Sequence, residues 1–212
     1  MTIVTRDSDI QIEKLSLGSF GTNTYTIICM KTMKSAVVDA PGEAGVIIEK
    51  LKDTSPQYIL LTHNHMDHLG ALAELHSSLN APIAAHAADS NLPVRPQISL
   101  NDGDKLPLGE LTIEVLHTPG HTPGGLCFRV GKYLMSGDTI FTAGPGKTRS
   151  PEAFKQVVKS ITEKIFILPE DTEIHPGHGD STTLTKEKEE YAVFATRKHD
   201  PNICGDIIWL KS

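Results

Sequence analysis

The sequence has few cysteines and none of the spacings that make a cysteine site. Its three cysteines, Cys29, Cys127 and Cys204, lie far apart, and no CxxC pair occurs. An odd number of widely spaced cysteines favours neither a disulfide framework nor a thiolate metal site. We therefore interpret all three as ordinary core or surface thiols.

Long apolar runs and an excess of positive charge are also missing. No stretch of roughly 18 apolar residues occurs, and the opening residues, MTIVTRDSDIQIEKL, lack the apolar region of a secretory signal. The net charge of −6 gives no support to a nucleic-acid or membrane-surface partner. A cytoplasmic location is the resulting expectation.

The remaining composition is that of an ordinary globular protein. Apolar residues make up 39% and charged residues 22% of the 212 residues, and no repeat or low-complexity linker interrupts them. A chain of this length is large enough to bury a substantial core. We expect a single domain over residues 1–212.

Apolar residues recur with the period of strands in some segments and of helices in others. Strands are expected at 24–30, 35–39, 58–62, 82–85, 111–116, 125–130, 132–135 and near 172–175, and helices at 42–52, 68–79, 151–162 and 185–196. The run YILLT at 58–62 is typical of a strand buried on both faces, a Gly131–Lys132 turn should join 125–130 to 132–135, and 91–107, rich in Pro, Asn and Asp, should be loop. This mixture predicts an α/β fold with layers of sheet and helix.

The most informative motif is THNHMDH at 62–68, directly after the expected buried strand. His63 and His65 are two residues apart on extended backbone, so that both side chains face one side. Asp67 and His68 follow where the chain turns into a helix, which can aim them at a neighbouring point. Imidazole and carboxylate together suit zinc, iron or manganese.

Three later residues extend this pattern. His121 in HTPGHTPGG, Asp138 in MSGDTIF and His178 in HPGHGDS each follow an expected strand and stand near glycine or proline. Functional groups are often carried by loops that rigid strands hold in place. All these residues are therefore candidate metal ligands.

The ligand count predicts two metal ions. His63, His65 and His121 can give three nitrogens to one ion, Asp67, His68 and His178 can bind a second, and Asp138 can bridge the two through its oxygens. Two divalent ions, two aspartates and a hydroxide leave a centre of about +1. Such a centre makes hydroxide available near neutral pH and polarises a carbonyl.

The other polar residues near these motifs have smaller expected roles. His76, His86 and His199 are expected to bind no metal, whereas His117 and His175 flank the ligands and are open to a supporting hydrogen bond. Asp39 ends the strand at 35–39. It is either a turn residue or a brace for the loop at 62–68.

THNHMDH, TPGHTPG, SGDTIF and PGHG, in this order over residues 20–180, resemble the motifs of the metallo-β-lactamase superfamily. The resemblance implies an αββα sandwich, with two mixed sheets between helices and the metal site at one edge. It also implies the seven ligands named above. Because many β-lactam-cleaving members carry Cys where this sequence has Asp138, the resemblance favours the glyoxalase II-like branch, which hydrolyses thioesters such as S-lactoylglutathione.

The resemblance is weaker at the substrate end. Lys147 matches a glutathione-binding lysine of glyoxalase II, while Arg149 stands where an aromatic residue is expected. Only residues 179–212 follow the last ligand, too few for the helical region that supplies further basic residues. Lys147 and Arg149 are candidate substrate-binding residues, and a solvated cationic loop is the alternative.

Hydrolysis of an anionic small-molecule thioester is the leading functional hypothesis. A bridging hydroxide would attack the carbonyl, with Asp67 orienting it and Asp138 joining two metal ions, zinc in the first instance. The first alternative is a mononuclear iron oxidoreductase resembling persulfide dioxygenases, whose loop after the aspartate usually reads Arg-Thr-Asp rather than Lys147-Thr148-Arg149. The second is a non-catalytic metal-binding module, against which the open metal positions argue.

Overall fold

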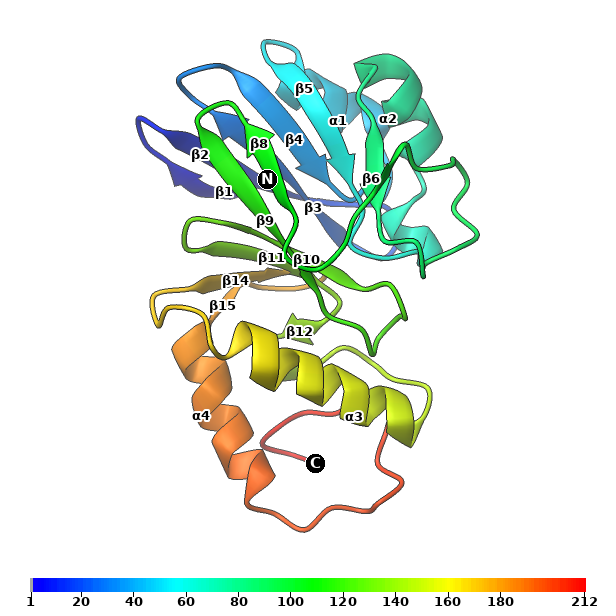
Figure 1. Ribbon diagram of the computed structural model, residues 1–212, viewed down its shortest axis with the longest axis vertical. Helices are drawn as coiled ribbons and strands as arrows, with labels where there is room; N and C mark the ends of the chain where they lie inside the picture. The colour runs from blue at the N-terminus through cyan, green and yellow to red at the C-terminus, as the bar shows by residue number, and fades with distance from the viewer. Residues whose placement is uncertain (1) are drawn as a thin grey trace.

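A computed structural model describes residues 2–212, and the first half of the chain forms a seven-stranded mixed sheet (Figure 1). Its strands are β1 (Thr2–Arg6), β2 (Ile10–Leu17), β3 (Thr22–Cys29), β4 (Lys34–Val38), β5 (Ser55–Leu60), β6 (Ile83–Ala85) and β7 (Ile98–Ser99), in that spatial order. The first four strands are antiparallel. From β4 to β7 the strands are parallel, so that their carboxyl ends meet at one edge.

A second mixed sheet of six strands faces the first. It comprises β8 (Lys105–Leu108), β9 (Leu111–His117), β10 (Leu126–Val130), β11 (Tyr133–Gly137), β14 (Glu173–Pro176) and β15 (Thr182–Thr183). Only β11 and β14 are parallel to each other. A small hairpin of β12 (Ile140–Phe141) and β13 (Gly144–Pro145) lies outside both sheets.

Strand periodicity divides the apolar residues among three layers. Side chains between the sheets include Ile12, Ile27 and Leu60 from the first sheet and Val115, Phe128 and Met135 from the second. Ile59 and Leu61, on either side of Leu60 in the chain, point to the opposite face and pack under helices. Both faces of the carboxyl end of β5 are therefore buried, as its uninterrupted apolar run predicts.

Helices cover the outer face of each sheet (Figure 1). On the first sheet lie α1 (Ala44–Leu51) and α2 (Leu72–Leu79), and on the second lie α3 (Pro151–Ser160) and α4 (Leu184–Ala195). Ser150 begins α3 by accepting a hydrogen bond from the backbone of Ala153, and Pro151 occupies the first helical position. No helix within residues 2–212 is long and apolar enough to cross a membrane.

Most of the expected elements are confirmed, with boundary shifts of a few residues, and so is the αββα sandwich with two mixed sheets. Gly131 adopts the left-handed φ of 58° in the turn between β10 and β11. All three cysteines are free, and Cys29 and Cys127 are buried.

Two expectations are wrong. The segment 91–107 is not all loop, because it contains β7 and most of β8, whose short strands pair at sheet edges despite their polar residues. The expected helix at 68–79 is instead a 3₁₀ turn, Met66–His68, followed by α2 from Leu72. The turn separates from the helix because Ala71 hydrogen-bonds back to Ala40.

The residues after α4 form no helix or strand, but they are anchored in the core of the second sheet. Trp209 is fully buried, with its ring centroid 4.9 Å from that of Phe194 and 5.2 Å from that of Tyr191. Its backbone N–H donates to Ala143. This tail, residues 203–212, therefore lies against the hairpin that follows Asp138.

Trp209→Ala should lower the free energy of unfolding by about 3–5 kcal/mol, because it removes a fully buried aromatic ring and leaves a cavity. Urea unfolding followed by circular dichroism measures the change. As a control, Ile167→Ala removes a side chain that is 74% exposed, and it should change stability by no more than about 0.5 kcal/mol. Equal effects of the two substitutions would contradict the anchoring role.

Candidate metal centre

The seven candidate ligands meet at one edge of the sandwich, where strands of both sheets end. His63 follows β5, His121 follows β9, Asp138 follows β11 and His178 follows β14. Residues 65–68 reach the same place through the 3₁₀ turn. The two sheets thus fix the four strand ends that lead into the cluster, as the sequence pattern predicts.

Three histidines form the first half of the cluster. Nδ1 of His65 lies 3.1 Å from Nε2 of His63 and 2.9 Å from Nε2 of His121. His63 is buried, while the other two are partly exposed. The three nitrogens can therefore contact one small ion whose remaining side is open.

The second half joins two histidines and a carboxylate. Nε2 of His178 lies 3.4 Å from Nε2 of His68 and 3.1 Å from Oδ2 of Asp67. The hydroxyl of Thr22 donates to the same oxygen of Asp67 over 3.2 Å. This hydrogen bond ties the start of β3 to the 3₁₀ turn.

Asp138 lies between the two halves. Its Oδ1 is 3.4 Å from Nε2 of His68, and its Oδ2 is 3.6 Å from Nε2 of His121 and 3.7 Å from Nε2 of His178. A side chain at Gly177 would collide with Oδ1 of Asp138 and the ring of His68. Glycine is therefore required next to His178 for the strands to bring these groups together.

The spacing of these atoms fits bound metal ions. Ligands about 2.0–2.1 Å from a tetrahedral ion are about 3.3 Å from one another, and the contacts within each half are 2.9–3.7 Å. Oδ1 of Asp138 is buried without a hydrogen-bond partner, a cost that a cation would remove. The donor set of imidazole and carboxylate suits zinc, iron or manganese.

Asp39 positions His68 from behind. Its Oδ2 lies 2.8 Å from Nδ1 of His68, and its two oxygens also accept hydrogen bonds from the backbone N–H and hydroxyl of Thr62. The N–H at Nδ1 directs the lone pair of Nε2 toward Asp67 and Asp138. The bracing role is thus the one the structure favours for Asp39.

His121 is oriented in a similar way by the loop that follows the β12–β13 hairpin. We call this loop, residues 146–149, the hairpin loop. Its Nδ1 donates to the carbonyl oxygen of Lys147 over 2.8 Å, which leaves the lone pair of Nε2 facing His65. Gly146 packs so closely against the Asp138 carbonyl that a Cβ there would collide with it. The loop after β13 therefore contacts two candidate ligands.

The electrostatics of the cluster favour a cation. Although burial alone would lower it, the charges of Asp39 and Asp138 raise the pKa of His68 to about 10. Burial acts against ionisation of Asp138, but the nearby imidazoles of His68, His63 and His121 hold its pKa well below the usual range. Burial and the other histidines lower the pKa of His63. In the metal-free cluster His68 therefore holds a proton between two carboxylates, and a metal ion that binds there takes the place of that proton.

The remaining histidines lie outside the cluster. His76 and His199 hydrogen-bond backbone carbonyls, of Ala81 and Phe194 respectively. His117 and His175 do not contact the ligands directly, since His117 bonds the Pro123 carbonyl and His175 the Ser181 hydroxyl. His86 stacks on His117 with ring centroids 3.9 Å apart.

The two candidate substrate-binding cations differ in their surroundings. Nζ of Lys147 lies 3.6 Å from Oδ2 of Asp206, and both side chains are exposed. Arg149 forms no ion pair with the residues that the structure describes, and its charge acts on His65. The contribution of Asp206 was not anticipated, because no motif marks a residue so distant from the others in sequence.

The tail and the hairpin loop are paired through their backbones. Thr148 and Gly205 exchange hydrogen bonds of 3.2 and 3.0 Å. Together with Trp209 and Asp206, these bonds hold the tail beside the loop that contacts His121.

A sequence model of the Metallo-beta-lactamase superfamily matches residues 17–193. The chain therefore belongs to this superfamily, as the four motifs indicate. The tail from residue 203 lies beyond the matched region.

Three individual proteins illustrate what the chain is similar to. The hydroxyacylglutathione hydrolase GloC of Haemophilus influenzae is 30% identical over 203 residues, which cover 84% of this chain and 95% of that protein. The TTHA1623 protein in a di-iron-bound form is 30% identical with a TM-score of 0.68, over 83% of this chain and 96% of that one. ETHE1 from Myxococcus xanthus is 25% identical with a TM-score of 0.75, over 84% and 81% of the two chains.

Asp39→Asn should weaken metal binding about 10- to 100-fold, because an amide N–H facing Nδ1 of His68 moves the imidazole proton to the metal-facing Nε2. Metal titration in competition with a chelating dye measures the affinity. Asp53→Asn, at an exposed position, is the matched control and should bind metal like the parent protein. Unchanged affinity in a folded Asp39→Asn variant would show that Asp39 does not orient His68.

Proposed function

We propose that this chain is a binuclear metallohydrolase that cleaves thioesters of anionic thiols, with S-lactoylglutathione as a representative substrate. The observation that carries the proposal is the convergence of two complete ligand groups on one shared carboxylate, Asp138. The similarity to a hydroxyacylglutathione hydrolase supports a thioester as substrate.

His63, His65 and His121 would hold one ion, Asp67, His68 and His178 the other, and Asp138 both. Divalent ions bound there supply Lewis acidity and lower the pKa of water, which makes hydroxide available at neutral pH. Asp39 and the Lys147 carbonyl support this arrangement, because they fix the ring orientations of His68 and His121.

The reaction requires one proton acceptor beside the attacking water. Oδ2 of Asp67 is engaged by Thr22 and His178, and we assign its second oxygen, Oδ1, to accept a hydrogen bond from that water. The water oxygen forms a bond to the thioester carbon, the carbon–sulfur bond breaks, and the thiolate leaves and takes up a proton. The products are a carboxylic acid and a thiol.

The competing function is a mononuclear iron oxidoreductase of the persulfide dioxygenase kind. The similarity to ETHE1 in fold is the observation that favours it. It would use His63, His121 and Asp138 and leave the group of Asp67, His68 and His178 without a task. The metal content of the protein distinguishes the two functions.

Protein purified without chelator should contain about two metal ions per chain. Asp138→Ala should lower metal content and thioesterase activity together, since it removes an anionic ligand from both halves. His76→Ala changes a histidine that bonds only Ala81 and should leave both unchanged. Elemental analysis and hydrolysis of S-lactoylglutathione are the measurements. Saturation at one iron per chain, with oxidation of glutathione persulfide, would instead establish the competing function.

Arg149→Ala should raise KM for S-lactoylglutathione about five- to tenfold with little change in kcat, because a charge-assisted contact away from the reacting bond acts equally in ground and transition states. Lys147→Ala should have a smaller effect, because Asp206 already pairs with this lysine.

The control for these two variants is an uncharged thioester, on which both should match the parent enzyme. If both variants also match the parent on S-lactoylglutathione, the loop is a solvated surface that does not hold the substrate.

A further inference from the structure

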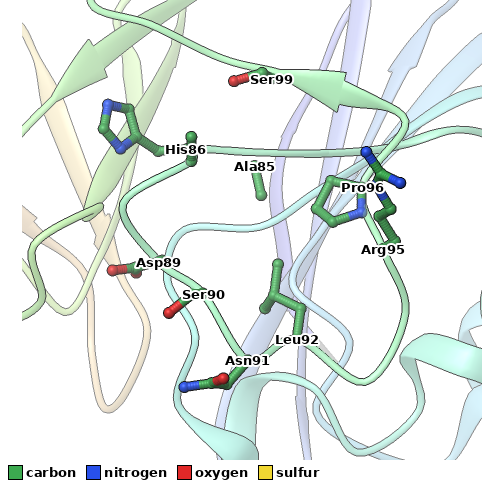
Figure 2. A pocket seen from close by; sticks show the side chains of 10 residues that line it. Ala85, His86, Asp89, Ser90, Asn91, Leu92, Arg95, Pro96 and Ser99 are labelled. Carbon is green, nitrogen blue, oxygen red and sulfur yellow. The ribbon is translucent and has the colours of Figure 1, made fainter.

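A groove beside the metal-binding cluster takes no part in the chemistry proposed above. We call it the 85–99 groove, after the residues that line it. Its volume is about 420 Å³ (Figure 2). This volume falls within the range of small-molecule sites, about 300–1,000 Å³. The groove is thus large enough for part of a substrate.

The topology of the first sheet places this groove at the edge that carries the cluster. His63 follows β5 and His86 follows β6, and these strands are parallel neighbours. Their carboxyl ends therefore open on the same side. In α/β folds, ligands bind at this end of the strands.

Hydrogen bonds connect the groove to the loops that carry the ligands. Asn64, which lies between His63 and His65, donates its side-chain N–H to the Ser90 carbonyl over 2.8 Å. Asp89 accepts hydrogen bonds from the backbone of Asn64 and the hydroxyl of Thr122, the neighbour of His121. One groove wall is therefore fixed relative to both ligand-bearing loops.

Arg95 is the one cationic Lys or Arg side chain in the lining of the groove. Asp89 is the one carboxylate in its lining, and its oxygens are occupied by Asn64, Thr122 and Gly124. Arg95 is exposed, and within residues 2–212 its guanidinium forms no ion pair. An anionic ligand would give this planar pair of N–H groups a partner.

His86 adds a second donor. Its Nδ1 accepts a hydrogen bond from the backbone of Ala88 over 3.1 Å, which places the proton of the neutral ring on Nε2. Stacking on His117, at an interplanar angle of 11°, fixes the ring. Burial, followed by the neighbouring His117, lowers the pKa of His86, so that the ring is a neutral donor near pH 7.

Apolar groups separate the two donors. Figure 2 shows His86 and Arg95 at opposite ends of the groove, with Ala85 and Leu92 between them. The His86 end is the one joined to the ligand loops, through Asp89. A ligand that reaches Arg95 from the cluster must therefore cross an apolar stretch.

We propose that the 85–99 groove binds the acyl arm of the substrate, and that this arm has an apolar body ending in a carboxylate that pairs with Arg95. The inference rests on the proposed thioesterase function and names a substrate class for it, the monothioesters of dicarboxylic acids. Arg149 and Lys147, on the hairpin loop, remain available to the thiol arm.

The kinetic test compares two glutathione thioesters with acyl chains of equal length, adipoyl and hexanoyl, on the metal-loaded enzyme. The parent should prefer the adipoyl thioester about five- to tenfold in kcat/KM, and Arg95→Gln should abolish this preference by slowing only the adipoyl reaction. Arg6→Gln, at an exposed position on β1, is the matched control and should keep it. Equal rates for both thioesters in the parent, or equal losses in Arg95→Gln, overturn the proposal.

A binding test separates the groove from the catalytic proposal. Monomethyl adipate should shift the imidazole resonances of His86 in the zinc-loaded protein, dimethyl adipate should not, and Arg95→Gln should weaken binding at least about fivefold. If neither thioester is cleaved but this Arg95-dependent binding occurs, the hydrolase function fails while the carboxylate site stands. Absence of binding, or binding that Arg95→Gln leaves unchanged, overturns the groove assignment.

Discussion

The buried carboxylate of Asp39 joins the parts of the molecule on which the site depends. Its backbone has the left-handed φ of 62°, uncommon for a residue other than glycine, and the side chain is almost fully buried. From there it accepts hydrogen bonds from Thr62, at the end of β5, and holds the ring of His68. A strained turn after β4 thus determines where the THNHMDH loop begins and how its last histidine points.

The rest of the cluster follows from two sheets that end at a common edge. Each sheet is buried on both faces, by the other sheet and by its own helices, so that the strand ends cannot shift independently. Short loops after the strands are then enough to bring the candidate ligands together. Close contacts at Gly177 and Gly146 show how little space these loops leave around Asp138. Burial of the apolar layers offsets the unfavourable free energy of bringing seven polar side chains together.

The sequence was sufficient for features that depend on local pattern and insufficient for those that depend on distant partners. The buried run of β5 and the spacing of His63 and His65 are visible in a few adjacent residues, and so the layered fold and the candidate ligands could be predicted. The edge strands β7 and β8 were missed because their polar residues are stabilised by pairing with neighbours. Asp206 and Asp89 were missed because their partners are remote in sequence.

The tail pairs with the hairpin loop through Gly205 and is anchored by Trp209, and it follows the residues 17–193 that the superfamily model matches. Because a ribosome makes the chain from its amino end, all seven candidate ligands emerge before this tail does. The loop that orients His121 is thus without its backbone partner until synthesis has passed Gly205. The support that this pairing gives to the orientation of His121 is in this respect completed late in synthesis.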